Sequence, residues 1–192
     1  MGRNKKIDLQ ELMEETEALL LDKGYEGFHF KALSEKLSVA RSTLYEYYRN
    51  KDELITAYMC DLMKRIMKDT YSIDQSQETG LKKLHSLLQL FLKHSQIYSM
   101  IQMRPHIKES SSPLVSEHLR ELDQSRMQLL VILHSAIEKG KAEGSIRADI
   151  QTSLIAGLFF HSVLIPNRSE MPQDQWASML FDLLENGMKA SD

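Results

Sequence analysis

The chain has 192 residues, of which 42% are hydrophobic and 27% are charged, and its formal net charge is −3 at pH 7. This composition is ordinary for a globular protein, and no run reaches the roughly 18 apolar residues of a membrane-spanning helix. The single cysteine, Cys60, excludes an internal disulfide, and no apolar stretch follows the charged N-terminus as in a secretory signal. A cytoplasmic protein without membrane attachment is therefore expected.

Helical periodicity in the N-terminal quarter predicts three helices. One apolar stripe runs through residues 7–23, and Gly24 is placed to end this helix because glycine accepts a left-handed backbone. Two short helices follow at residues 31–37 and 40–48, joined by a tight turn at Ser38-Val39. This spacing is typical of a helix-turn-helix.

The helix at residues 40–48 has an apolar inner face and a polar outer face. Leu44 and Tyr48 lie four residues apart, so both are expected on the inner face. The outer face then offers hydrogen-bonding groups and one fixed cation, which suits the major groove of DNA. It consists of Ser42, Tyr45 and Glu46, with Arg41 and Thr43 on its flanks.

The sign of the charge changes where this motif begins. Residues 8–26 are strongly acidic, whereas residues 28–51 are mainly basic, and a short basic arm stands before residue 7. Solvated helix faces also carry such charges, but here the change coincides with the motif. Positive charge is therefore expected where DNA phosphates would lie.

The rest of the chain is also predicted to be helical. A long helix begins after Asn50, whose side chain can cap it, and Glu53 completes a capping-box pattern. Apolar residues at helical spacing predict its extent and those of the later helices. The predicted helices span residues 51–71, 81–95, 114–139, 149–164 and 173–188.

Residues 23–54 resemble the DNA-binding domain of TetR-family bacterial transcriptional regulators. The resemblance rests on Gly24-Tyr25, on residues 33–37, and on Thr43-Leu44-Tyr45 followed by Tyr48, Lys51 and Leu54, where Tyr48 stands at the usual Phe. It implies an all-α fold of about nine helices, including a short one at residues 97–103. Residues 1–50 would form a three-helix DNA-binding domain with a helix-turn-helix, and residues 51–192 a helical effector-binding and dimerisation domain.

The resemblance also implies roles for individual residues. The helix at residues 40–48 would enter the major groove of a double-stranded operator. The residues expected at base edges are Arg41, Ser42, Thr43 and Glu46, and those expected at phosphates are Lys31, Tyr45, Tyr47 and Lys51.

The same resemblance implies a cavity for an unknown small effector in the middle of the chain. Many methionines suit an adaptable apolar pocket, although an ordinary helical core would also contain them. The expected lining is Met63, Met67, Phe91, His94, Tyr98, Met100, Met103, Met127, Leu130 and His134.

The last two helices have more apolar surface than one small core can absorb. The resemblance implies that they form a four-helix interface with a second copy, and Ala156-Gly157 would allow helices to approach closely. The alternative is that the apolar side chains of these two helices only fill the core of a single chain. The expected interface residues are Leu154, Gly157, Leu158, His161, Trp176, Leu180, Leu183 and Leu184.

Enzymatic motifs are absent from the sequence. No nucleophile elbow, phosphate-binding glycine loop or pair of histidines at metal-binding spacing occurs, so no catalytic residue, metal or cofactor is expected. Together with the resemblance, the sequence predicts a homodimeric repressor that an apolar or amphipathic effector releases from a palindromic operator. The alternative is a DNA-binding adaptor of the same fold that recruits a protein and has no small ligand; a helical enzyme is disfavoured.

Overall fold

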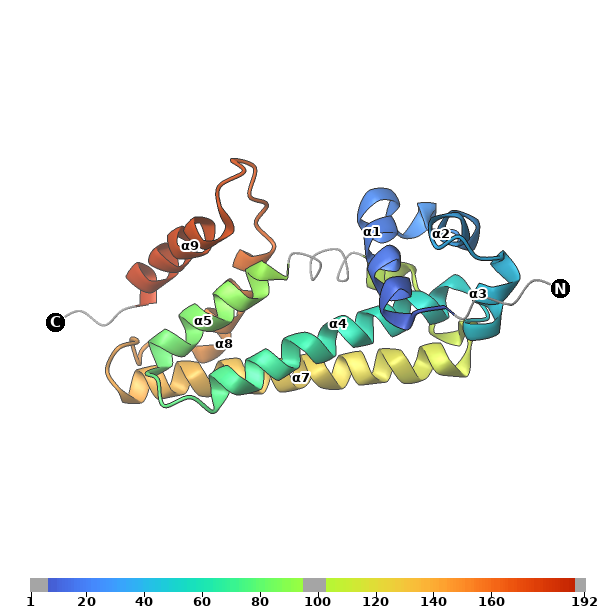
Figure 1. Cartoon of the computed structure of the whole chain (residues 1–192). Coiled ribbons are helices and arrows are strands. Elements are labelled where there is room, and N and C mark those ends of the chain that lie inside the picture. The colour runs from blue at the N-terminus through green and yellow to red at the C-terminus, as the bar shows by residue number, and fades with distance from the viewer. Residues whose placement is uncertain (1–6, 95–102, 189–192) are drawn as a thin grey trace. The chain divides into compact units, whose positions relative to one another are not determined.

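The structure is a computed structural model that describes residues 7–94 and 103–188 (Figure 1). Within these residues it contains eight α-helices and two short 3-10 helices, which confirms the all-α prediction. The chain divides into two compact units, Met1–Met63 with Ser99–Asp123, and Lys64–Tyr98 with Gln124–Asp192. We call them the first and the second unit. The first unit extends beyond the predicted boundary at residue 50, because it also takes in residues 51–63 and 99–123.

The first unit contains three complete α-helices around a small core. Five of its leucine and phenylalanine side chains have no exposed surface: Leu12, Phe28, Leu33, Leu44 and Leu54. Its complete elements are α1 (Leu9–Gly27), α2 (Phe30–Lys36), α3 (Arg41–Tyr47), η1 (Arg104–His106) and η2 (Glu109–Ser111). It also includes the beginnings of α4 (Lys51–Asp74) and α7 (Pro113–Ala142).

Helix α1 is interrupted at Gly24, as the sequence predicts. The backbone there has φ 65° and ψ −177°, a conformation that is essentially restricted to glycine. One short helical stretch continues beyond it to Gly27. The helix begins at Leu9 and not at residue 7, because the Asp8 carboxylate caps it by accepting the backbone N–H of Gln10 at 2.8 Å.

The turn between α2 and α3 is closed by two backbone hydrogen bonds. The Val39 N–H donates to the Ser34 carbonyl at 3.1 Å, and the Ser38 N–H donates to the Glu35 carbonyl at 3.3 Å. This is the Schellman pattern, whose left-handed residue is Ser38 with φ 53°. The helix-turn-helix therefore folds with a serine where glycine is preferred.

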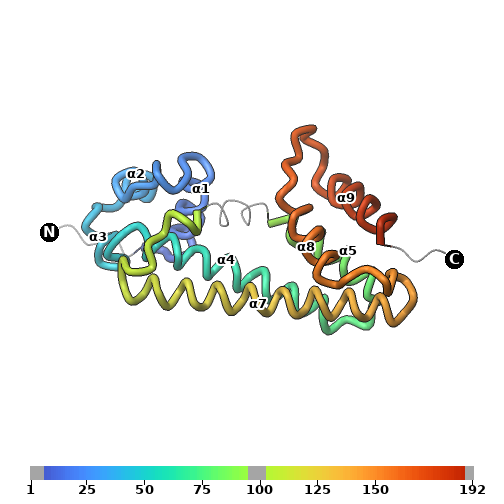
Figure 2. The backbone as a smooth tube through the Cα atoms, turned by 180° about the vertical axis from the view of Figure 1, so that it is seen from behind, coloured from blue at the N-terminus to red at the C-terminus, as the bar shows by residue number. Residues whose placement is uncertain are grey.

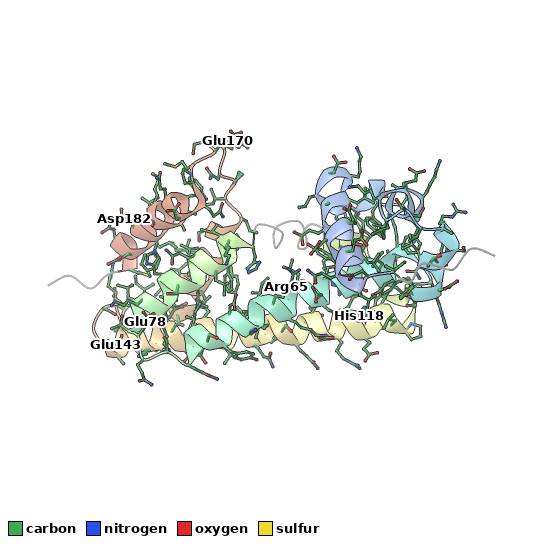
Figure 3. The ribbon with its side chains drawn as sticks, in the orientation of Figure 1. Arg65, Glu78, His118, Glu143, Glu170 and Asp182 are labelled. Carbon is green, nitrogen blue, oxygen red and sulfur yellow. The ribbon has the colours of Figure 1, made fainter. Side chains whose placement is uncertain are left out.

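Helix α4 begins with two capping hydrogen bonds. The Asn50 side chain accepts the Glu53 N–H at 2.9 Å, and the Glu53 carboxylate accepts the Arg49 N–H at 2.8 Å. One turn later the Thr56 hydroxyl lies 2.9 Å from Nδ1 of His118, which Figure 3 labels on α7. These bonds fix the start of α4 against α3 and α7 within the first unit.

The second unit is built around α5 (Gly80–Lys93), which packs against α8 (Thr152–Val163) and α9 (Gln173–Met188) (Figure 2). Phe91 packs against two rings of α8: its centroid is 6.1 Å from that of Phe159 and 6.3 Å from that of Phe160. The later parts of α4 and α7 complete this unit.

The start of α5 meets the end of α7 at very close range. A Cβ on Gly80 would lie 2.2 Å from the Gly140 backbone nitrogen and 2.4 Å from the Ala136 carbonyl oxygen. The Gly80 N–H donates to the Glu143 carboxylate at 2.8 Å, and Lys139 donates to the Glu78 carbonyl. Figure 3 labels Glu78 and Glu143 at this end of the unit. Only glycine fits at residue 80.

The predicted helices of the second half of the chain agree with the structure to within a few residues. The exception is the helix predicted at residues 97–103, which lies mostly outside the described residues. Across residues 7–94 and 103–188, no helix combines the length and the apolar character needed to cross a membrane.

Candidate nucleic-acid interface

Helix α3 presents a polar face to solvent. Arg41, Ser42, Tyr45 and Glu46 are all exposed, and half of the Tyr45 surface (50%) is accessible. Its opposite face carries Leu44, which is completely buried. The exposed side chains are one cation, one anion and two hydroxyls, a set that can donate to and accept from base edges.

Thr43 is a correction to this set. The sequence placed it on the flank of the outer face, but only 5% of its surface is exposed. It lies beside Leu44 on the side of α3 that packs onto the domain, so we remove it from the residues expected at base edges.

The position of Tyr45 is set by helix α2. Its ring packs against that of Phe30 at a centroid distance of 5.0 Å and an angle of 56°. Because Phe30 is buried, it fixes one side of the Tyr45 ring, while half of the tyrosine surface stays accessible. Lys31 is exposed on α2, and Tyr47 on α3 is half-buried.

Lys51 is half-buried and already engaged within the protein. Its ammonium group donates to the Tyr25 carbonyl oxygen at 2.9 Å and lies 4.0 Å from the centroid of the Tyr25 ring. An ammonium group has three N–H donors, so this bond leaves others for a phosphate. The sequence did not predict this contact, since it joins residues 26 positions apart.

The neighbouring carboxylates lie where the helix dipole favours them. Asp52 and Glu53 are in the first turn of α4 and are 9% and 4% exposed. Asp52 accepts a hydrogen bond from the Tyr25 hydroxyl at 2.7 Å. Burial and this bond raise the pKa of Tyr25 above its ordinary value, and burial also raises the pKa of Tyr48. Both phenols therefore stay neutral at physiological pH.

A second surface lies on the last two helices. Leu154 and Leu158 on α8 are 56% and 55% exposed, and Leu183 on α9 is 68% exposed. Leu154, Leu158 and His161 follow helical spacing, so they share one face of α8. Exposed aliphatic side chains that share one face are typical of surfaces that contact another protein.

The predicted interface needs one correction and one addition. Leu180 is only 6% exposed, so it belongs to the core of its own unit, and Trp176, Leu184 and Gly157 are partly covered. Met179, which the prediction did not include, is 47% exposed. It lies four residues before Leu183 and so shares one face of α9 with it.

The predicted effector residues separate into three groups. Met67, Phe91 and Met103 are buried and Met63, His94 and Leu130 are half-buried, whereas Tyr98 and Met100 lie outside the described residues. Met127 and His134 are corrections, because both side chains are exposed on α7. They share their face of the helix with Val131, which is 65% exposed, while Leu133 and Ile137 point into the core.

Comparison with known proteins agrees with this geometry. Residues 12–58 match the family profile described as bacterial regulatory proteins, tetR family. The HTH-type transcriptional regulator YvkB of Bacillus subtilis (strain 168) is 30% identical over 181 residues, which cover 90% of this chain and 92% of YvkB.

Solved structures show the same fold at low sequence identity. The ketosteroid transcriptional regulator KstR2 of Mycobacterium tuberculosis superposes with a TM-score of 0.79 at 15% identity, over 98% of this chain and 100% of KstR2. The regulator FadR from Bacillus subtilis, solved in complex with stearoyl-CoA, gives a TM-score of 0.70 at 15% identity over 94% and 99% of the two chains.

The exposed α3 on a helix-turn-helix within an all-α fold defines a DNA-binding transcriptional regulator. With its relative YvkB and the matching N-terminal profile, the chain belongs to the TetR family of bacterial regulatory proteins. It is a regulator and not an enzyme.

Proposed function

We propose that the protein is a homodimeric repressor that binds a palindromic operator and is released by an apolar or amphipathic small molecule. The observation that carries this proposal is the exposed polar face of α3, since the opposite face of that helix is buried at Thr43 and Leu44. In this proposal residues 1–50 read the DNA, and residues 51–192 dimerise and bind the effector.

The exposed residues of α3 have different tasks in this proposal. Arg41 reads a guanine edge, where a bidentate contact gives about 1–3 kcal/mol of discrimination. Ser42 contacts a neighbouring base. Glu46 either accepts a hydrogen bond from a cytosine amino group or narrows the range of sequences that α3 tolerates. Base contacts of this kind select the site.

The remaining residues hold the phosphate backbone. Lys31, Tyr45, Tyr47 and Lys51 have donors that suit phosphate oxygens, and their contacts fix the register of α3 in the groove. Removal of one of them is expected to weaken binding to all sequences alike, whereas removal of Arg41 changes base preference.

The exposed leucines of α8 and α9 support a homodimer. A two-fold axis brings the same face of both copies together, so Leu154, Leu158 and Leu183 of each chain bury one another. A symmetric dimer presents two copies of α3, which predicts a palindromic operator with half-sites about one helical turn or more apart.

An apolar or amphipathic effector is supported by the apolar side chains of α4 and α5, where Met67 and Phe91 are buried. The neighbour FadR was solved with stearoyl-CoA, an amphipathic thioester, so acyl-CoA compounds are the first class to test. Release requires that the effector bind the DNA-free state more tightly, by about 1–3 kcal/mol in typical allosteric proteins.

The DNA-reading part is tested by selecting bound duplexes from a random pool, with Arg41→Ala and Lys31→Ala in parallel. We expect a palindrome for the wild type, relaxed preference at one symmetric pair of positions for Arg41→Ala, and unchanged preference with weaker binding for Lys31→Ala. If Arg41→Ala selects the wild-type sequence, Arg41 does not read a base.

The effector part is tested with coenzyme A, short- and long-chain acyl-CoA thioesters and free fatty acids. Each compound is measured for thermal stabilisation and for release of the selected duplex, since a ligand at 100 times its Kd stabilises by about 2.7 kcal/mol. If none stabilises the protein and a protein partner is captured on the DNA-bound form, the adaptor alternative replaces the effector.

A further inference from the structure

The Tyr25 side chain connects two segments of the first unit at the start of α4. Its hydroxyl donates to the Asp52 carboxylate at 2.7 Å, and its backbone carbonyl accepts from the Lys51 ammonium group at 2.9 Å. The same ammonium group lies 4.0 Å from the centroid of the Tyr25 ring. Tyr25 therefore contacts Lys51 through both its backbone and its ring.

A third segment reaches the same ring. His106, the last residue of η1, stacks on Tyr25 with ring centroids 5.6 Å apart and planes 22° apart. Its Nδ1 lies 3.7 Å from the Glu26 carboxylate. Met103 and Ile107, on either side of η1, are 5% and 4% exposed, so both ends of the segment are anchored in the first unit.

These contacts matter because a lysine side chain is long and flexible. Its ammonium group is a strongly hydrated point charge, and it does not hold one direction unless neighbours fix it. The Tyr25 ring attracts this charge through a cation–π contact, which requires the face of the ring to lie toward the ammonium group. Asp52 holds the edge of that ring through the hydroxyl, and the stacked His106 restricts movement of its face.

We propose that His106 is a positioning residue for Lys51, acting through the Tyr25 ring. The proposal rests on the proposed role of Lys51 as a phosphate contact. It makes operator affinity depend on the segment 103–107, which lies outside the helix-turn-helix. Met103, one of the predicted effector residues, is three positions from His106, so a ligand that displaces Met103 would also disturb the lysine.

The salt dependence of operator binding tests this proposal. The slope of log K against log salt changes by about 0.9 for each phosphate contact, so loss of Lys51 from both copies of a dimer flattens it by about 1.8. Lys51→Ala is expected to show this full change. His106→Ala is expected to show about half of it or more, with a threefold to tenfold loss of affinity at low salt.

Four further variants separate a positioning role of His106 from a general effect on stability. His106→Phe keeps a stacked ring and is expected to restore the wild-type slope, whereas His106→Gln keeps polarity without a ring and is expected to resemble His106→Ala. The double variant Lys51→Ala/His106→Ala is expected to have the slope of Lys51→Ala alone. His134→Ala, which removes an exposed histidine of the second unit, is the matched control and is expected to bind like the wild type.

The outcomes distinguish the phosphate contact of Lys51 from the positioning role of His106. If Lys51→Ala leaves the slope unchanged, Lys51 is not a phosphate contact, and the role on which the proposal depends is wrong. If Lys51→Ala flattens the slope but His106→Ala does not, the DNA contact stands and the His106 proposal is overturned. Should His106→Ala melt below the assay temperature, the comparison of His106→Phe with His106→Gln decides in the same way.

Discussion

Truncation of Leu158 to alanine is expected to weaken the dimer by a calculable amount. Full burial of a leucine side chain stabilises by roughly 1.5–3 kcal/mol. In a single chain 55% of Leu158 is exposed, so about half of that energy, or about 1 kcal/mol, is available on dimerisation. Both copies lose it, so the total of about 2 kcal/mol corresponds to a roughly 30-fold higher Kd of the dimer.

Sedimentation equilibrium over a range of protein concentrations measures this Kd directly. Leu21→Ala is the matched control, because Leu21 is the same residue type, is 53% exposed, and lies on α1. Its dimer Kd is expected to stay within twofold of the wild type. Equal Kd values for the two variants, or a wild type that remains monomeric at micromolar concentrations, would refute the assignment of α8 and α9 as the interface.

Three predictions concern the folding of the protomer. Gly80→Ala is expected to lower the free energy of unfolding by about 1–3 kcal/mol or more, because a Cβ would lie 2.2 Å from the Gly140 nitrogen. Gly187→Ala is the control, since a Cβ there would have nothing within 4 Å. Equal urea midpoints for the two variants would contradict the close approach at Gly80. Gly24→Ala is expected to lower the free energy of unfolding by about 1–3 kcal/mol, although nothing would lie within 4 Å of its Cβ, because the φ of 65° alone opposes a side chain. An unchanged urea midpoint would show that the kink is dispensable. The raised pKa of Tyr25 contributes stability that is fully present below pH 10 and is lost as pH rises further, because the folded state holds the phenol proton more tightly. Tyr25→Phe should therefore lose less stability between pH 10 and 11 than the wild type. Identical alkaline unfolding curves for the two proteins would contradict this prediction.

The local parts of this fold could be predicted closely from the sequence. The bounds of α2 and α3 differ from the prediction by one residue, because apolar spacing and the turn at Ser38 act over a few neighbouring positions. The interruption at Gly24 and the cap at Asn50 were predicted for the same reason. These features depend on side chains and backbone within one turn.

The features that the sequence did not predict depend on tertiary contacts. Helix α7 carries apolar residues on two faces, and periodicity alone does not show that Met127 faces solvent while Leu133 is buried. Thr43 was placed on the flank of the outer face because Leu44 and Tyr48 were expected to face inward, but packing of α3 covers it. Likewise, no local signal joins His106 to Tyr25, which lies 81 positions earlier.

The proposed homodimerisation joins the two proposed surfaces, α3 and the leucines of α8 and α9, into one function. The most direct test is the mass of the complex on a selected operator duplex and on a duplex cut to one half-site, measured by native mass spectrometry. An even number of chains on the full operator, with binding to the half-site weakened at least 100-fold, is the predicted result. One chain per duplex, bound equally well to the full operator and to the half-site, would contradict symmetric operator recognition.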